Sequence, residues 1–376
     1  MRIAVWNASG LPPHFTTGVG KHFIHVVDGL ARAPGNEVVL FTPRTTPPKS
    51  VDDPALSPLG HVPVRRLPWN RRPLEAAWRV ASRPAMTRWA RGFDWLYTPR
   101  ELWCPPGGMR YALTVHDLYA HEPASRAPGP LARLRTKVLA RALRRADVVL
   151  AVSEFTKSRL MELFGVQAEK IAVVFNGAGA AYFAEGREPS PLPDGVPARY
   201  VLAVGGLRAK KGAEAQLRLA EALAAREAGI SLLALGPVDP PYVARARACR
   251  RLVVLDRGIP NAQVEALTRG AVASVMLSEY EGFGIPLVEA MAAGVPAIGA
   301  RRASLPEVLG PGGLVVDPMD AAGIAGLIVA LAEGGERRAQ AVAHGRERAR
   351  LFTWEACVAR VRRAMETDRN GEAAGA

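Results

Sequence analysis

The stretch from residue 278 to 298, with the apolar run before it, constrains the fold of this chain most. An apolar run at 273–277 is followed by a loop with two glycines at 281–284, a helical apolar pattern from Pro286, and a second apolar run at 295–299. Proline suits the start of a helix, and Gly294 followed by Pro296 ends one. The order predicts strand, glycine loop, helix and strand, which is the crossover unit of a parallel sheet.

Two carboxylates distinguish this unit from a purely structural crossover. Glu281 lies in the glycine loop and Glu289 in the helix, with seven residues between them. Backbone N–H groups at a helix start attract anions, and we expect this of Gly284, Ile285 and Leu287. N–H groups that bind a phosphate, next to carboxylates that accept from sugar hydroxyls, suit a nucleoside diphosphate sugar. Glu289 would bind the ribose, and Glu281 would bind the transferred sugar. The alternative is that Glu289 only complements the helix dipole and Glu281 is a solvated loop residue.

The same stretch resembles the Glu-x7-Glu donor motif of the retaining glycosyltransferases of the GT-B fold, family four, in its Glu-Gly-Phe-Gly-x-Pro form. The motif adds Phe283 to the expected donor site. The resemblance spans nearly the whole chain and is most specific between residues 200 and 310. It implies an α/β protein with two Rossmann-like domains, whose parallel sheets face each other across a central cleft.

The expected domains follow from this resemblance and from composition. An N-terminal acceptor-side domain covers residues 1–178, and a donor-binding domain covers 199–352. Residues 179–198 are rich in proline and glycine and predict a linker. The resemblance also implies that a last helix, at about 353–366, packs back on the first domain.

A basic, glycine-rich loop at 205–212 lies between a predicted strand and a predicted helix. Such a loop is a phosphate site in physical terms, although a solvated basic turn is the alternative. The resemblance places Lys211 on the diphosphate, with Lys210 beside it. The arginine that is frequent in the family falls on Gly206 here, so we expect Arg208 or Lys210 to supply a second cation.

Near the N-terminus, Gly18 and Gly20 precede a helix predicted from about Lys21 to Arg32. A glycine turn before a helix again presents N–H groups to an anion. A dinucleotide fingerprint is rejected, because Phe23 stands where the last glycine of Gly-x-Gly-x-x-Gly would be. The resemblance implies that this glycine loop faces the donor phosphate and the acceptor.

A His116–Asp117 pair follows the predicted strand at 111–114, at the edge where open α/β sheets bind ligands. The alternative is a histidine that only holds a loop in place. A histidine-aspartate pair at this place is common in the resembled family, where the histidine lies near the transferred sugar. We therefore expect His116 to bind the donor sugar or the acceptor.

The chain carries a net charge of +14 that is unevenly distributed. Residues 51–150 hold 17 Lys and Arg against 8 Asp and Glu, and arginines alternate with Trp78 and Trp89 at helical spacing. Such a surface can contact an anionic membrane, and we consider this for residues 65–145. The alternative is a solvated basic face whose tryptophans lie in the core. No nucleic-acid motif accompanies the charge, so no nucleic-acid partner is expected.

Other features indicate where such a protein works. The three cysteines are far apart and suggest neither a metal site nor a disulfide framework. Residues 1–13 read as a first strand rather than a signal peptide, and no run approaches the roughly 18 apolar residues of a membrane span. We expect a cytoplasmic protein that contacts the inner membrane surface at most peripherally.

The predicted reaction is retaining transfer of a hexose from a nucleoside diphosphate sugar to a glycan, a lipid-linked acceptor or a small molecule. We assign Glu281, His116 and Lys211 to catalysis. No Asp-x-Asp occurs in the chain, so no metal ion and no cofactor are expected. The Gly-Phe-Gly-x-Pro form favours a mannose-type hexose slightly over other sugars. The alternatives are a nucleotide-sugar epimerase of the same fold, and a basic protein that binds nucleic acid or membranes through a degenerate site.

Overall fold

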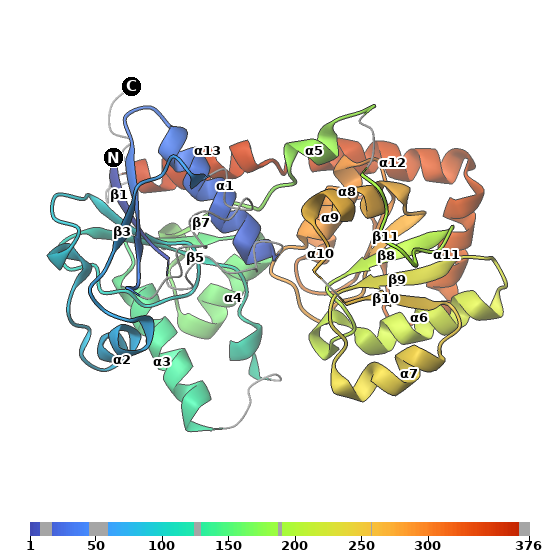
Figure 1. The fold of residues 1–376 in the computed structure, drawn as a ribbon, viewed down its shortest axis with the longest axis horizontal. Coiled ribbons are helices and arrows are strands. Elements are labelled where there is room, and N and C mark those ends of the chain that lie inside the picture. Colours follow the sequence, from blue (N-terminus) through green and yellow to red (C-terminus); the bar gives the residue numbers. More distant parts are fainter. Residues whose placement is uncertain (8–16, 45–58, 124–128, 187–189, 257, 368–376) are drawn as a thin grey trace. The chain divides into compact units, whose positions relative to one another are not determined.

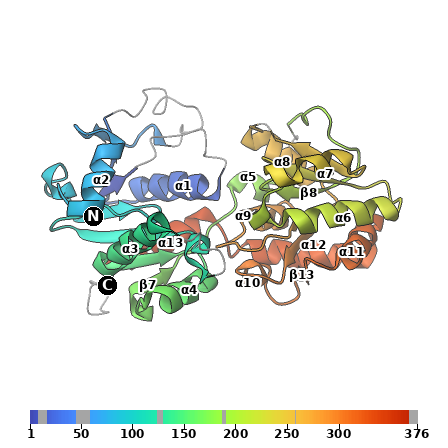
Figure 2. The ribbon, with the colours of Figure 1, turned by 90° about the horizontal axis from the view of Figure 1, so that it is seen from below.

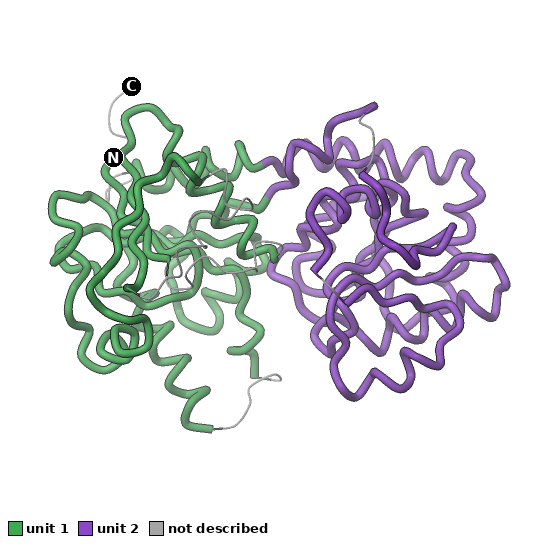
Figure 3. The backbone as a smooth tube through the Cα atoms, in the orientation of Figure 1, with its two compact units in different colours: residues 1–176, 354–376 green, residues 177–353 purple. Residues whose placement is uncertain are grey.

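The computed structural model describes residues 1–7, 17–44, 59–123, 129–186, 190–256 and 258–367 (Figure 1). The chain divides into two compact units (Figure 3). Unit 1 comprises Met1–Asn176 with Trp354–Ala376, and unit 2 comprises Gly177–Thr353. Each unit is a parallel sheet with helices on both faces, which confirms the expected α/β class with two Rossmann-like domains (Figures 1 and 2).

Unit 1 contains a seven-stranded sheet of order β3-β2-β1-β4-β5-β6-β7, in which every neighbouring pair is parallel. The order reverses between β1 and β4, as in doubly wound folds. The central strands are apolar on both faces because helices cover both faces of the sheet. The strands are β1 (Arg2–Trp6), β2 (Glu37–Thr42), β3 (Val64–Arg66), β4 (Trp95–Thr98), β5 (Arg110–Val115), β6 (Val148–Ala151) and β7 (Ile171–Val173).

The helices of unit 1 join these strands and include the end of the chain. The last helix packs against the first, and the chain thereby returns to unit 1 after completing unit 2. The helical segments are α1 (Gly18–Arg32), α2 (Arg71–Ala81), η3 (Met86–Arg88), η4 (Tyr119–His121), α3 (Pro130–Arg145), α4 (Glu154–Phe164), η6 (Ala168–Lys170) and α13 (Trp354–Glu366).

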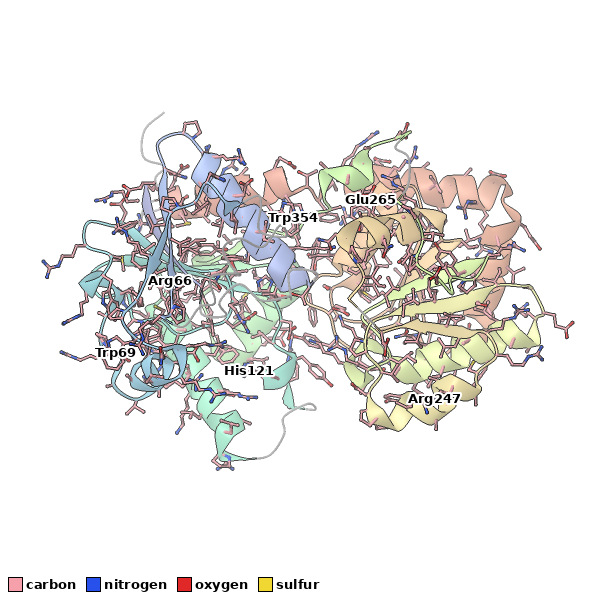
Figure 4. The ribbon with its side chains drawn as sticks, in the orientation of Figure 1. Arg66, Trp69, His121, Arg247, Glu265 and Trp354 are labelled. Carbon is pink, nitrogen blue, oxygen red and sulfur yellow. The ribbon has the colours of Figure 1, made fainter. Side chains whose placement is uncertain are left out.

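The tryptophans at positions 69, 78 and 89, within the basic stretch 65–145, differ in how far they are buried. Trp78 on α2 is completely buried, and its ring meets Trp6 edge to face with ring centroids 5.0 Å apart. Trp89 packs against the same core, whereas Trp69 is 43% exposed beside the start of α2 (Figure 4). The core alternative therefore holds for Trp78 and Trp89 and not for Trp69.

Unit 2 contains a six-stranded parallel sheet of order β10-β9-β8-β11-β12-β13. Its order reverses between β8 and β11, so these two adjacent strands flank the topological switch point. The strands are β8 (Tyr200–Val204), β9 (Ser231–Leu235), β10 (Leu252–Leu255), β11 (Ala273–Met276), β12 (Ala297–Ala300) and β13 (Leu314–Val316).

The crossover unit predicted from residues 273–299 is confirmed as β11, α9 and β12. Seven of the eight residues of α9 are buried, because α12 covers one side of the helix and the sheet the other. The helical segments of unit 2 are α5 (Ala180–Phe183), η7 (Ala209–Lys211), α6 (Ala213–Ala225), η8 (Pro240–Tyr242), α7 (Val243–Ala248), α8 (Asn261–Gly270), α9 (Ile285–Ala292), α10 (Leu305–Leu309), α11 (Ala321–Glu333) and α12 (Gly335–Ala349).

Two predicted segments differ from the structure. Helix α1 begins at Gly18 rather than Lys21, because the Thr17 hydroxyl caps the helix by accepting from the N–H of Gly20 at 3.1 Å. Within the stretch 179–198, short helix α5 forms in unit 2 and buries Tyr182; residues 187–189 lie outside the described part.

Over the described ranges, no helix combines the length and apolar character needed to cross a bilayer.

Candidate functional site

Two loops of unit 2 meet at the switch point of its sheet. The loop after β8 carries the basic stretch 205–212, and the loop after β11 carries the acidic glycine loop 278–284. Because β8 and β11 are neighbours that run parallel, both loops leave the same edge of the sheet. This is the position at which open α/β sheets bind ligands. The fold thereby brings together residues that are about seventy positions apart in sequence.

The contact between these loops is an ion pair with a shared hydrogen bond. The ammonium Nζ of Lys211 donates to Oε1 of Glu281 at 2.7 Å. The hydroxyl of Ser278 donates to the same oxygen at 2.6 Å. The side chains of Lys211 and Glu281 are 21% and 12% exposed, so the pair is largely shielded yet reachable from solvent. Charges in such a position interact more strongly than on an open surface.

The three basic side chains of the first loop lie in different environments. The Arg208 guanidinium donates from Nε to the carbonyl oxygen of Gly205 at 3.1 Å, and the residue is exposed. The ammonium of Lys210 lies over the ring of Tyr280, 5.7 Å from its centroid. Lys211 is the one of the three that is bonded to Glu281. The two lysines, which are adjacent in sequence, therefore have different partners: Lys211 pairs with Glu281, and Lys210 lies over Tyr280.

The backbone of the basic loop explains why glycine stands where the resembled family often has arginine. Gly206 has a φ of +76°, and a Cβ there would lie 2.1 Å from the carbonyl oxygen of Pro237. Gly212 is equally restricted, since a Cβ would lie 2.0 Å from the carbonyl oxygen of Leu277. A side chain at Gly206 is excluded by its backbone surroundings. The stem of Lys211 instead packs over Gly205.

The start of α9 offers fewer donors than predicted. The N–H of Leu287 donates to the carbonyl oxygen of Gly284 at 3.0 Å, so the expectation that this N–H is available was wrong. Gly284 precedes the helix with a φ of +109°, a conformation that favours glycine. The side chains of Phe283, Ile285 and Leu287 are buried, at most 5% exposed. Any ligand contact of these residues would therefore involve their backbone.

Ser304 holds the glycine loop 281–284 in its conformation through its hydroxyl group. Its completely buried hydroxyl lies 2.9 Å from the carbonyl oxygens of both Glu281 and Phe283. The Phe283 ring in turn meets Phe352 edge to face at 5.3 Å. The loop that carries Glu281 is thus held by contacts on either side of the carboxylate. This role of Ser304 was not predicted from the sequence.

Glu289, on α9, has different neighbours from this ion pair. It is only 3% exposed, and the hydroxyl of Tyr182 on α5 hydrogen-bonds to it. Burial raises the pKa of Tyr182 well above its usual range, and the carboxylates of Glu289 and Glu265 raise it further. Tyr182 therefore stays protonated and donates to the carboxylate. A ribose that reaches Glu289 would have to share this carboxylate with Tyr182.

Helix α5 is held in this position by α8. The Arg269 guanidinium donates from Nη2 to the carbonyl oxygens of Ala181 at 2.6 Å and Ala184 at 2.9 Å. The same guanidinium pairs with Glu265 at 3.1 Å, and Figure 4 shows Glu265 beside α5. The stretch that composition predicts to be a linker thus supplies the hydroxyl that contacts Glu289.

In unit 1, His116 lies just beyond β5 and is 8% exposed. Its Nε2 is 2.9 Å from the carbonyl oxygen of Pro99, which can only accept, so Nε2 carries a proton. The backbone N–H groups of His116 and Asp117 both donate to Oε1 of Glu101. Glu101 therefore anchors the loop, and in the neutral ring Nδ1 is the acceptor nitrogen.

A second histidine, His22 on α1, lies against His116 with ring centroids 4.8 Å apart. It is completely buried, with Nδ1 2.9 Å from Oδ1 of Asn176 and Nε2 facing the hydroxyls of Tyr97 and Thr114 at 3.1 and 3.2 Å. Burial lowers the pKa of His22 well below its ordinary value, and the neighbouring His116 lowers it further. His22 is therefore a neutral hydrogen-bonding group.

The neighbouring turn of α1 carries a third histidine. His25 stacks on Trp354 of α13 with centroids 4.6 Å apart, and Figure 4 shows Trp354 beside α1. Burial lowers the pKa of His25 to about 4, and the charge of Lys21 contributes. His22 was not predicted, because its partners Tyr97, Thr114 and Asn176 are far from it in the sequence. Helical periodicity on the inner face of α1 is the only signal that could have found it.

The predicted glycines of unit 1 lie in the first turn of α1. The N–H of Gly20 is used in the cap with Thr17, so it is already bonded within the protein. Their predicted contact with a donor phosphate stays a prediction. In the part of the chain that the structure describes, no three His, Cys, Asp or Glu side chains are grouped in a way that could hold a metal ion.

Comparison with known families matches both halves of the chain. Residues 16–180 match the family described as Glycosyltransferase Family 4, and residues 188–348 match the family described as Glycosyl transferases group 1. The first segment includes strands β2 to β7 of unit 1, and the second includes all six strands of the sheet of unit 2.

Individual relatives and structures agree with this. The chain is 29% identical over 278 residues to O-antigen chain mannosyltransferase B of Escherichia coli, covering 70% of this chain and 72% of the relative. It is 29% identical over 234 residues to the MMP alpha-(1->4)-mannosyltransferase of Mycolicibacterium hassiacum, covering 58% of this chain and 54% of the relative. Among solved structures, Anabaena HepE in complex with UDP-glucose superposes with a TM-score of 0.69 at 18% identity, covering 96% and 98% of the two chains.

The matches over both halves, the relatives and the two parallel sheets agree on one family. The chain is a glycosyltransferase of the GT-B fold with the hexosyltransferase activity of that family, and it belongs to the group 1, family-four glycosyl transferases.

Proposed function

We propose that this chain is a retaining, metal-independent hexosyltransferase that uses a nucleoside diphosphate sugar. The acceptor is a glycan, a lipid-linked glycan or a small molecule. A mannose-type hexose is favoured, because the two relatives named above are mannosyltransferases. The observation that carries the proposal is the Lys211–Glu281 pair with Ser278 at the switch point of unit 2.

The leaving group determines what such a site must supply. When the glycosidic bond breaks, negative charge accumulates on the nucleoside diphosphate. A fixed ammonium at this point stabilises the charge in the transition state, and electrostatic stabilisation of this kind is often the largest catalytic contribution. Lys211 is the candidate, with Arg208 or Lys210 as the second cation. Because cations already serve this purpose, the proposal includes no metal ion and no cofactor.

The pairing of Lys211 with Glu281 couples recognition of the two ends of the donor. In the free protein, the ammonium and the carboxylate satisfy each other at 2.7 Å. A diphosphate that binds the ammonium leaves the carboxylate with its contact to Ser278 and with capacity to accept from a sugar hydroxyl. Glu281 then orients the transferred hexose or stabilises positive charge at its anomeric carbon.

The other donor contacts follow from the same proposal. Glu289 binds the ribose diol, sharing its carboxylate with Tyr182. Backbone groups at Phe283, Gly284 and Ile285 face the phosphates. In unit 1, His116 presents Nδ1 to a sugar hydroxyl, because its Nε2 is engaged with Pro99. Gly18 and Gly20 border the phosphate and the acceptor.

A screen of donors tests the proposal. The purified protein is incubated with GDP-mannose, UDP-glucose and other nucleotide sugars, with glycan, lipid-linked and small-molecule acceptors, and release of nucleoside diphosphate is measured with and without a chelator. We expect acceptor-dependent release that the chelator does not affect, and a product whose anomeric configuration by NMR equals that of the donor.

The alternatives give different outcomes. Formation of a free isomer without any acceptor would support an epimerase. Steeply salt-dependent binding to nucleic acid or vesicles, with no turnover of any donor and no effect of Glu289→Ala, would support a binding protein with a degenerate site. An inverted product or loss of activity with the chelator would contradict the retaining or the metal-independent part of the proposal. Contact of residues 65–145 with an anionic membrane is also a proposal.

A further inference from the structure

The N-terminal half of α3, residues 130–138, carries apolar side chains that face solvent. Leu131 is 59% exposed and Leu134 is 44% exposed. In the C-terminal half of the same helix, Leu139 and Leu143 are buried in the core of unit 1. The N-terminal turns project beyond the other helices of unit 1 (Figure 1). The C-terminal half of α3 therefore packs in the core of unit 1, whereas the apolar side chains of the N-terminal half remain in solvent.

The exposed half is also strongly basic. Helix α3 contains five arginines and one lysine and no acidic residue. Arg133, Arg135 and Lys137 are exposed, and no ion pair joins them to any carboxylate in the described ranges. Farther along the helix, by contrast, Arg141 donates to the carbonyl oxygen of Arg79 at 2.9 Å and Arg145 pairs with Asp147 at 3.2 Å. The partnered arginines lie in the core-facing half.

Folding alone does not favour this arrangement. Cations near the N-terminus of a helix oppose the helix dipole, which stabilises anions there. Exposed leucines gain nothing from the core. Leu131 and Leu134 are three residues apart, Arg135 follows Leu131 by four, and Lys137 follows Leu134 by three, so these four side chains lie on one side of the helix. Arg133, two residues after Leu131, does not share that side. A partner surface with anionic groups next to apolar groups would offset both the unfavourable position of the cations and the exposure of the leucines.

We propose that residues 130–138 of α3 dock on the surface of an anionic phospholipid membrane. Leu131 and Leu134 insert between the acyl chains, and Arg135 and Lys137 beside them contact lipid phosphates. Arg133, farther round the helix, adds to the attraction through its charge. A nucleic acid would satisfy the cations but would leave the leucines in water, so the membrane fits the whole surface. The inference does not depend on the sugar or the acceptor of the transfer reaction.

Unit 2 offers matched control positions for a test. Arg247, Arg250 and Arg337 are exposed on other helices and loops, and Figure 4 shows Arg247 on the outside of α7. Leu192 and Leu351 are 47% and 51% exposed, close to the values of the two α3 leucines. Substituting these residues changes charge and apolar surface by equal amounts without touching α3.

The experiment is co-sedimentation of the full chain with vesicles. One set contains equal parts phosphatidylglycerol and phosphatidylcholine, and the other contains phosphatidylcholine alone. We expect binding to the anionic vesicles that weakens in high salt. R133E/R135E/K137E should lower the partition coefficient on the order of 100-fold. L131S/L134S should lower it about tenfold, and the controls R247E/R250E/R337E and L192S/L351S should bind like the wild type.

Several outcomes would overturn the inference. One is absence of binding to phosphatidylglycerol vesicles; another is an equal loss of binding in the unit 2 control variants, which would indicate general charge attraction. Tighter binding to a duplex RNA than to vesicles, with L131S/L134S unaffected, would indicate nucleic acid instead. Tryptophan fluorescence and nucleotide binding of each variant show whether the protein is folded, and they separate this inference from the proposed donor site.

Discussion

In unit 2 the side chains of Lys211 and Glu281 beyond the sheet are charged and reachable from solvent, whereas the imidazole of His22 in unit 1 is neutral and enclosed. Lys211 and Glu281 pair at 2.7 Å with both side chains partly exposed. His22 is completely buried among hydroxyls and an amide. Both sets lie on the same kind of parallel sheet. The architecture therefore does not decide the chemistry, which depends on the side chains that the loops and helices place there.

The difference has a consequence for how each set responds to a ligand. An ammonium paired with a carboxylate can exchange its partner for a diphosphate, because one charged acceptor replaces another. A buried neutral network gains nothing from such an exchange, since each donor and acceptor already has its partner. We therefore expect substitutions in unit 2 to affect catalysis and those at His22 to affect stability.

The largest effect is expected from Lys211→Met, which keeps the stem over Gly205 and removes the charge. Loss of a preorganised charge at a leaving group costs about 100- to 1,000-fold in kcat. Lys210→Met removes an equal charge from the ring of Tyr280 and should cost less than about tenfold. Release of nucleoside diphosphate in the donor screen measures both. Equal losses in the two variants would break the distinction between the lysines.

His22→Leu tests the enclosed network of unit 1. The variant leaves Asn176, Tyr97 and Thr114 without the imidazole, and buried polar groups without partners cost about 1–3 kcal/mol each, so a loss of about 3 kcal/mol is expected. All seven tryptophans lie in unit 1, so urea unfolding followed by tryptophan fluorescence reports on this unit. The exposed His61→Leu is the control. A loss below about 0.5 kcal/mol for His22→Leu would contradict the structural role.

The stability of unit 1 should depend on pH through the histidines of α1. Because the pKa of His25 is about 4 in the folded state and about 6.5 when unfolded, the unfolded chain binds a proton that the folded chain does not. The contribution of His25 to the free energy of unfolding is therefore fully present above about pH 6.5 and is lost as the pH falls towards 4. At pH 5 the free energy of unfolding should be about 2 kcal/mol lower than at pH 8. His22, whose pKa is also lowered, acts in the same direction.

Urea unfolding at pH 8 and pH 5, monitored by tryptophan fluorescence, measures this effect in unit 1. His25→Gln should remove much of the difference between the two pH values, because glutamine does not titrate. An unchanged pH dependence in that variant would contradict the assignment to His25.

The smallest effect is expected from Ser304→Ala in unit 2. The substitution removes the hydroxyl that contacts the carbonyl oxygens of Glu281 and Phe283, at a cost of about 1 kcal/mol in stability. Because the loop then loses a contact that positions Glu281, KM for the donor should rise while tryptophan fluorescence of unit 1 stays unchanged. Ser304→Thr should restore part of the affinity, and no change in KM would contradict a positioning role.

The donor loop of unit 2 was predictable from the sequence, and the histidine network of unit 1 was not. The donor loop of unit 2 is continuous from 278 to 284 and follows recognisable strand and glycine patterns, so Glu281 and the crossover were predictable. His22 was not, because its partners come from residues 97, 114 and 176, which only the folded sheet brings together. Because the Thr17 side chain caps α1, the helix begins at Gly18, three residues before its predicted start at Lys21. The hydroxyl of Tyr182 was hidden in a stretch whose composition predicts a linker.

Calorimetric titration of UDP, GDP, ADP and dTDP, without metal, tests the central claim most directly, with Lys211→Met and Glu289→Gln as variants. The account predicts that one nucleotide binds selectively to the wild type and at least about tenfold more weakly to each variant. The Tyr182→Phe variant, which removes the hydroxyl partner of Glu289, should retain binding. Unchanged affinity in both Lys211→Met and Glu289→Gln, or no binding of any nucleotide to the wild type, would contradict a donor site in unit 2.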